Sequence, residues 1–289
     1  MMTGQGPTTT RRRLRAQLRN LRQAKGMSVE DVASELEWST SKLVRIEGGQ
    51  VGISVTDLNA LLTAYGVSDR ARVEELRALA RSSRQRTWWS AYQRYIPASY
   101  LEFIGAESDA TRIRHYHPTT VPGLLQTPAY AEAIIEATTL EELPSDIAKA
   151  RSEVRRKRQE QILDRPEPPE LTVILDEAVL RRPVGGLATM REQLDHLIAM
   201  AERDSVTLVV VPFSAGPHPG LAGAFALMEY DDPVNDDVLC LETATNDVIL
   251  RDNHKLIEQY RRAADRIEEI GLREPEAMKY VERVRNELG

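Results

Sequence analysis

The stretch SVEDVASELEWSTSKLVRIEGG, residues 28–49, decides the fold of the N-terminal part of the chain. Apolar residues recur at helical spacing in two runs separated by Glu37-Trp38, first at Val29, Val32, Ala33 and Leu36, then at Leu43, Val44 and Ile46. Two short helices joined by a tight turn are typical of a helix-turn-helix. The other residues of the second helix then form a face that can enter the major groove of DNA, at Thr40, Ser41, Lys42 and Arg45.

The flanking sequence predicts a compact all-α domain of five helices over residues 11–82. One helix precedes the stretch, at residues 11–25, and two follow it, at about 54–65 and 69–81. Ser28 and Asp31 have the spacing of a capping box, and Ser39 is a suitable N-cap for the second helix of the motif. Residues 1–10 are polar and contain Gly and Pro, which predicts a disordered tail.

Charge divides the chain into two parts. Residues 1–86 hold 15 Lys and Arg against 9 Asp and Glu, a net charge of +6, whereas the remainder is at −12, for a total of −6. A basic N-terminal part attracts phosphate, and an acidic remainder is unsuited to lie along DNA. DNA binding is therefore the first hypothesis, and the alternative is a helix-turn-helix used only for protein contact.

The words LRNLRQAKGMSVEDVASELEWSTSKLVRIEGGQ and LNALLTAYGV resemble the phage-repressor-like helix-turn-helix family of the Cro/C1, or XRE, type. The resemblance covers most of residues 11–66. It implies base contacts from Thr40, Ser41, Lys42 and Arg45, and an internal ion pair between Arg22 and Glu47. Thr40-Ser41 stands where glutamines are common, so the operator sequence is left open. Arg45 can bind a guanine through O6 and N7. Candidate phosphate contacts are Arg12, Arg15, Ser28, Val29, Ser39 and Gln50.

Residues 83–92 are predicted to connect this domain to the second one, at residues 93–289. Six aromatic residues gather here and just beyond, at Trp88, Trp89, Tyr92, Tyr95, Tyr100 and Phe103. They are interpreted as a packing segment, with a ligand-facing aromatic wall as the alternative. The helix expected at residues 147–163 is dense in Arg and Lys, which favours a solvated face over contact with DNA.

The second domain is predicted to be α+β, with a small, mainly antiparallel sheet flanked by helices. Strands are expected at residues 171–175, 205–211, 222–230 and 237–242, with a further short one at 247–250. Helices are expected at residues 190–203, 253–270 and 274–288, in addition to those near 131–137 and 147–163.

A second resemblance rests on the words TVPGLLQTPAYAEAII, RRKRQEQIL, LDEAVLRRPVGG, QLDHLIAM and VVPFSAGPHPGLAGAF. Together they are similar to the C-terminal domain of actinobacterial regulators of the Scr1 or WhiJ-like kind, over most of residues 88–289. The resemblance implies a small partner protein encoded nearby and, in some members, an antitoxin-like role. It supplies no catalytic residues.

Tests for chemistry in the second domain fail on sequence grounds. His115 and His117 would share a face only on a strand, and no neighbouring Cys or HExxH helix completes a metal site, so no metal and no cofactor are expected. No catalytic constellation is present, and the chain is not expected to be an enzyme. The most site-like feature is the loop at residues 213–223, with ligand or partner candidates at Trp88, Trp89, Tyr116, Gln126, Glu177 and His218.

These observations favour a homodimeric transcriptional regulator that reads two half-sites of double-stranded DNA about 34 Å apart. The second domain would dimerise and sense a small-molecule effector or a partner protein. The alternatives are an antitoxin-like module that sequesters a small partner, and an enzyme fused to a DNA-binding domain. One cysteine, Cys240, and the lack of a long apolar run or signal sequence favour a cytoplasmic, nucleoid-associated protein without membrane contact.

Overall fold

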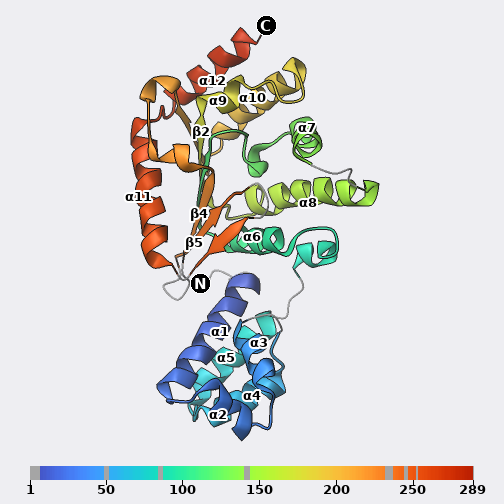
Figure 1. Ribbon diagram of the computed structural model, residues 1–289, viewed down its shortest axis with the longest axis vertical. Helices are drawn as coiled ribbons and strands as arrows, with labels where there is room; N and C mark the ends of the chain where they lie inside the picture. Colours follow the sequence, from blue (N-terminus) through green and yellow to red (C-terminus); the bar gives the residue numbers. More distant parts are fainter. Residues whose placement is uncertain are drawn as a thin grey trace. The chain divides into compact units, whose positions relative to one another are not determined.

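The computed structural model describes residues 7–48, 52–83, 87–139, 144–231, 237–243, 247–251 and 253–288 (Figure 1). The chain divides into two compact units between Ser90 and Ala91, within the predicted connector. Each unit has its own apolar core and is described by itself. None of the described helices has the length and apolar character that crossing a membrane requires.

The first unit is helical. Its elements are α1 (Pro7–Ala24), α2 (Val29–Glu35), α3 (Thr40–Gly48), α4 (Val55–Ala64) and α5 (Arg70–Ser83), and the 3-10 helix η1 (Trp88–Tyr92) runs across the boundary. The core is made by fully buried leucines of α1, α3, α4 and α5, namely Leu18, Leu43, Leu58, Leu61 and Leu76. Residues 7–10, predicted to belong to the disordered tail, are the first turn of α1. Proline is favoured there because its fixed φ suits a helix start and its missing N–H is not needed.

The helix-turn-helix forms where the sequence predicts it, with one correction. Leu43 and Ile46 of α3 are buried at 0% and 4% exposure, but Val44, predicted to share their apolar face, is 52% exposed. Successive residues of a helix are about 100° apart, so the residue after Leu43 turns away from the core. Val44 therefore lies on the same outer face as the polar residues of α3.

The capping box that begins α2 is formed. The Ser28 hydroxyl accepts a hydrogen bond from the Asp31 amide at 3.0 Å, and Asp31 Oδ2 accepts one from the Ser28 amide at 2.8 Å. We expect Ser28→Ala to lower the free energy of unfolding of the first unit by about 1 kcal/mol, because an orphan amide loses its acceptor. Urea unfolding followed by tryptophan fluorescence measures this. Ser28→Gly is the matched control and should cost only a few tenths of a kcal/mol; equal costs would contradict the capping role.

The second unit is built on a sheet with helices on both faces. Its helices are α6 (Ala98–Asp109), α7 (Pro128–Thr138), α8 (Ser145–Leu163), α9 (Glu177–Arg181), α10 (Leu187–Ala201), α11 (His254–Ile270) and α12 (Glu276–Glu287), with 3-10 turns η2 (Gly123–Leu125), η3 (Phe213–Ala215) and η4 (Pro219–Ala222). Its strands are β1 (Arg112–His117), β2 (Glu170–Asp176), β3 (Val206–Val211), β4 (Phe225–Glu229), β5 (Val238–Leu241) and β6 (Val248–Leu250).

The sheet is mixed, which corrects the expectation of a small, mainly antiparallel one. In the described part of the chain its order is β3-β2-β1-β4-β5-β6. β1 pairs with β2, and β2 with β3, in parallel. On the other side of β1, β4 pairs with β1, β5 with β4 and β6 with β5, each antiparallel. Parallel strands need long crossovers, which α7 with α8, and α9 with α10, provide. The strand β1 was missed because its sequence RIRHYH alternates charged or imidazole groups with few apolar ones.

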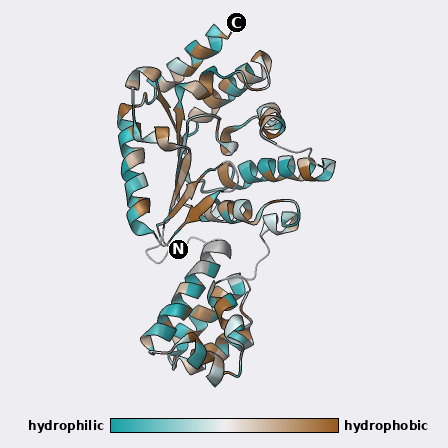
Figure 2. Cartoon of the chain, in the orientation of Figure 1, coloured by the Kyte–Doolittle hydropathy of each residue, from teal (hydrophilic) through white to brown (hydrophobic). Residues whose placement is uncertain are grey.

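Two cores lie on the two faces of the sheet. One contains Ile113, Val173 and Met228 together with residues of α6, α8, α10 and α12, and the other contains Tyr116, Ile174 and Phe225 together with residues of α11. Figure 1 shows α11 on one side of the strands and α6, α8 and α10 on the other, and Figure 2 shows the hydrophobic residues concentrated along the strands. Neighbouring residues of a strand point to opposite faces, so Ile113 and Tyr116, three positions apart on β1, belong to different cores.

Candidate functional site

The outer face of α3 is the candidate nucleic-acid interface. Thr40, Ser41, Val44 and Arg45 are exposed, and Leu43 and Ile46 hold the opposite face of the helix in the core. Ser39, also exposed, accepts a hydrogen bond from the Lys42 amide at 3.2 Å and so orders the first turn. The helix thus presents two hydroxyls, an isopropyl group and a guanidinium, groups that can contact base edges in a groove.

Lys42 is held within the first unit. Its Nζ lies 2.7 Å from Asp57 Oδ1 on α4 and 3.6 Å from the centroid of the Trp38 ring. Burial alone would raise the pKa of Asp57, but the hydrogen bonds from Lys42 and Ser54 outweigh it, so this pKa is lowered. The ammonium has three donors and the Lys42 side chain is 38% exposed, so a contact with a base would share the ammonium with Asp57. Sequence reasoning missed both neighbours, since Asp57 reads as a helix-start residue and Trp38 as an interruption.

The ion pair expected between Arg22 and Glu47 is present and joins α1 to α3. Arg22 Nε and Nη2 donate to the two carboxylate oxygens at 2.8 and 3.0 Å, and Nη1 donates to the Met27 carbonyl at 2.9 Å. Arg19 also donates to the Glu47 carbonyl at 3.2 Å. The hydrogen bonds with Glu47 raise the pKa of Arg22. The pair fixes the C-terminal turn of α3 and so the direction of its outer face.

The residues predicted to contact phosphates differ in how exposed they are and in whether they already have a hydrogen-bond partner. Ser39 is exposed, and Arg15 and Val29 are half-buried. The Ser28 amide is already bound by Asp31, so it is not available to a phosphate while the capping box is closed. The side chain of Arg12 and the whole of Gln50 lie outside the described residues.

The residues predicted as ligand candidates do not form one site, although two of them contact each other. Tyr116 packs against the His218 ring, with centroids 5.9 Å apart, in the core that also contains α11. Gln126 follows Leu125, which belongs to the core on the other face of the sheet. The Gln126 side chain donates to the Val121 carbonyl and accepts from Arg155, each at 2.7 Å. Trp88 and Trp89 belong to the first unit, where their rings meet edge to face.

The loop at residues 213–223 is tied to the sheet by structural contacts. Glu177, predicted to lie near it, accepts a hydrogen bond from the Phe213 amide at 2.8 Å and pairs with Arg181. A Cβ at Gly220 would lie 2.3 Å from Tyr116 Cζ, so this glycine makes room for a buried tyrosine ring. The absence of a side chain here serves packing, although Phe213 and Leu221 remain 60% and 65% exposed.

The basic helix α8 is solvated only in part: Arg156 has a side chain that is 59% exposed, as expected, but Arg158 is buried, which corrects the expectation for that residue. Arg158, 4% exposed, donates from Nη2 to Glu107 Oε1 at 2.7 Å, and Glu107 of α6 is fully buried. Arg158 Nη1 also donates to the Tyr100 hydroxyl at 3.0 Å. Burial opposes both charges, but their mutual attraction outweighs it, so the pKa of Glu107 is lowered and that of Arg158 is raised. The pattern of charges along α8 does not indicate that Arg158 pairs with Glu107, which lies 51 residues earlier in the chain.

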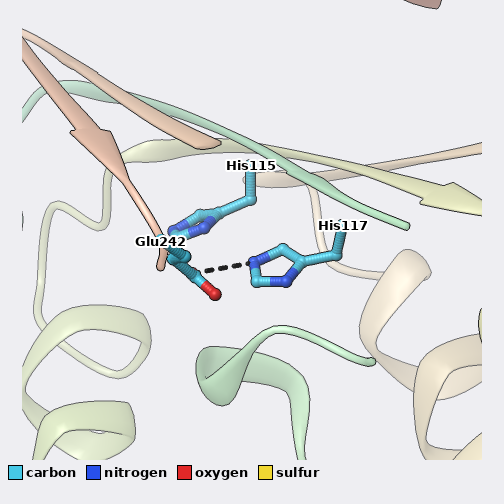
Figure 3. A group of neighbouring side chains, drawn as sticks. All are labelled: His115, His117 and Glu242. Carbon is cyan, nitrogen blue, oxygen red and sulfur yellow. Dashed lines mark ion pairs between the residues drawn. The ribbon is translucent and has the colours of Figure 1, made fainter. Parts of the chain in front are cut away.

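A cluster of His115, His117 and Glu242 was also missed (Figure 3). Because β1 is a strand, both imidazoles lie on one face, and Glu242 follows β5 at the end of the strands where His117 lies. His117 Nε2 lies 3.4 Å from Glu242 Oε1, and burial lowers the pKa of His117 to about 4. The alternation in RIRHYH was the available signal, but no local pattern links it to Glu242.

Comparison with known proteins gives two family matches. A helix-turn-helix domain matches residues 13–76, and a domain of unknown function, DUF5753, matches residues 100–283. No curated protein and no solved structure matches the chain. The first match agrees with the geometry of α2 and α3 and indicates a DNA-binding regulator. The second covers more than half of the chain, and the chain therefore belongs to the family of proteins that carry the DUF5753 domain.

Proposed function

We propose that this protein is a sequence-specific transcriptional regulator of the XRE type, which reads DNA with the outer face of α3. The observation that carries the proposal is the exposure of Thr40, Ser41 and Arg45 on a helix whose other face is buried in a helix-turn-helix. Arg45 can bind a guanine through two hydrogen bonds, and Val44 can meet the methyl group of a thymine. No catalytic residue is assigned.

The second unit is proposed to dimerise the protein and to sense a signal, and its resemblance to Scr1 and WhiJ-like regulators implies a small partner protein encoded nearby. Two first units in a homodimer would then read half-sites about 34 Å apart. A signal acts by binding one arrangement of the two units more tightly than the other. The exposed side chains of Phe213 and Leu221 favour a small partner protein as that signal, and an antitoxin-like role is the second candidate.

Selection of genomic fragments by the full chain at physiological salt tests the proposal. We expect one recurrent site, bound at least about a thousandfold more tightly than random sequence. Size measurement of the protein and of its complex then gives the number of chains per site. Equal affinity for all fragments would reject sequence-specific regulation, while copurification of a stoichiometric small protein without a preferred fragment would favour the antitoxin-like candidate.

We expect Arg45→Ala to weaken binding at the selected site by about 1–3 kcal/mol and to relax the preference at one base pair. The reason is the loss of a bidentate contact to a base edge. Competition binding with every single-base variant of the site measures it. Arg15→Ala should instead weaken all sequences alike and lower the salt slope by about one. Arg266→Ala, an exposed arginine of the second unit, is the neutral control; a uniform loss for Arg45→Ala would exclude base reading.

A further inference from the structure

We propose that the second unit binds a divalent transition-metal ion, of which Zn²⁺ is the probe, through His115, His117 and Glu242. The ligand atoms of these three side chains all lie within 4.8 Å of one another. The two histidines lie on β1 and Glu242 directly follows β5, and β4 lies between these two strands. The site is independent of DNA binding and uses none of the residues of α3.

The pairing of the sheet explains why these side chains meet. His115 is in register with Ala226 of β4, which is in register with Cys240 of β5. One row further, the Glu242 amide donates to the Ala224 carbonyl at 3.3 Å, beside the end of β1 where His117 lies. Small alanine side chains on the middle strand leave the space above it to the larger groups on either side. The imidazoles of β1 and the carboxylate after β5 therefore share one space, as Figure 3 shows.

The two histidines are buried, but their ring nitrogens make no hydrogen bonds within the part of the chain that the structure describes. His115 and His117 are 1% and 4% exposed, and neither ring nitrogen of either residue has a hydrogen-bond partner among the described residues. A buried polar atom without a partner is costly, and native proteins rarely keep four of them together. Binding a metal ion through one nitrogen of each ring would give the lone pair of that nitrogen a partner. Two apolar side chains would fill the same space without the cost of burying unpaired ring nitrogens.

The donor set fits a zinc-type ion. Two imidazoles and one carboxylate are a known zinc ligand set with a fourth position left open, and Zn–N and Zn–O distances are about 2.0–2.2 Å. Ligand atoms around such an ion lie about 3.4 Å apart, close to the 3.4 Å between His117 and Glu242. The Glu242 side chain is 38% exposed, so it can move closer to the two histidines and shorten the distances between ligand atoms, which are now up to 4.8 Å. The fourth coordination position of the ion would then face water.

A second carboxylate lies near one of the proposed ligands. His115 Nε2 lies 3.6 Å from Glu107 Oε1, just beyond hydrogen-bond distance, so a small shift of the ring would let Nε2 donate to Glu107 while Nδ1 binds the ion. Carboxylates in this position commonly fix the ring of a metal-binding histidine. Glu107 itself is paired with Arg158, so it neutralises that nearby cation and is not counted as a ligand.

Metal uptake by the full chain tests the site. The protein is stripped with a chelator, and Zn²⁺ and Co²⁺ are titrated by calorimetry and by visible absorption, respectively. We expect one ion per chain, a cobalt spectrum typical of nitrogen and oxygen ligands, and a higher melting temperature with Zn²⁺. Glu242→Gln should weaken binding at least tenfold and remove the zinc-dependent rise in melting temperature, and His117→Asn should do the same.

Two controls separate loss of the site from loss of the fold. Metal-free Glu242→Gln should have the circular dichroism and melting temperature of the metal-free parent, since its carboxylate is partly exposed. Glu269→Gln, an exposed carboxylate on α11 against the other face of the sheet, should bind as the parent does. The proposal is overturned when the parent takes up no ion, or when Glu242→Gln and Glu269→Gln bind it equally well.

Discussion

Glu107→Gln is expected to lower the free energy of unfolding of the second unit by about 3–5 kcal/mol. Glu107 and Arg158 are 0% and 4% exposed, and the pair contributes two hydrogen bonds between α6 and α8. The neutral amide leaves the guanidinium buried without a counter-charge. A cost of this size is a large fraction of the 5–15 kcal/mol by which proteins are typically stable.

Urea unfolding followed by far-ultraviolet circular dichroism measures the loss. All three tryptophans, Trp38, Trp88 and Trp89, belong to the first unit, so their fluorescence transition should not move and serves as an internal control. Glu102→Gln is the matched control on the same helix, because the Glu102 side chain is 52% exposed in its pair with Arg251. It should cost less than about 1 kcal/mol. A loss as small for Glu107→Gln would mean that Arg158 finds water or another acceptor.

Arg22→Met is expected to destabilise the first unit by about 3 kcal/mol, because it strands the buried carboxylate of Glu47. The side chains of the two residues are 12% and 7% exposed, and they join α1 to the end of α3. Affinity for the selected DNA site should fall as well, although Arg22 lies away from the outer face of α3, since that face loses its fixed direction. Tryptophan fluorescence in urea measures the first effect and competition binding the second.

The double substitution Arg22→Met with Glu47→Leu distinguishes a buried charge from a packing defect. Apolar replacement of both partners should recover most of the lost stability, because no charge is then stranded. Arg72→Gln is the surface control, since Arg72 and Glu75 are 38% and 39% exposed, and it should cost under about 1 kcal/mol. Failure of the double substitution to recover stability would show that the shape of the arginine, rather than its charge, holds α1 to α3.

The first unit was largely predictable because its determinants are local. Helix starts at Ser28 and Ser39, and the apolar spacing of Leu43 and Ile46, lie within one turn of the residues that they order. The errors were local too: Val44 was assigned to the core by its apolar character, although its angular position turns it outward. The direction of a side chain follows from the helix period more reliably than from its hydrophobicity.

The second unit was harder to predict because its contacts join distant segments. Most of its strands were found, but β1 was not, and β1 is the centre of the mixed sheet, with β2 on one side and β4 on the other. Without it, neither the parallel pairings nor the separation of Tyr116 from Gln126 onto different faces could be deduced. The ligand candidates chosen from sequence are therefore divided between structural roles in two cores.

By itself, the sequence determined that the chain carries a basic helix-turn-helix on an acidic remainder, and that Thr40, Ser41 and Arg45 lie on the outer face of its second helix. Short-range periodicity and capping are enough for that, because a helix is ordered by residues three and four positions apart. Only the tertiary structure decided that Lys42 is bound to Asp57, that Glu107 neutralises Arg158, and that His115 and His117 meet Glu242. Those groups are brought together by sheet register and helix packing, which depend on the whole domain closing around its cores.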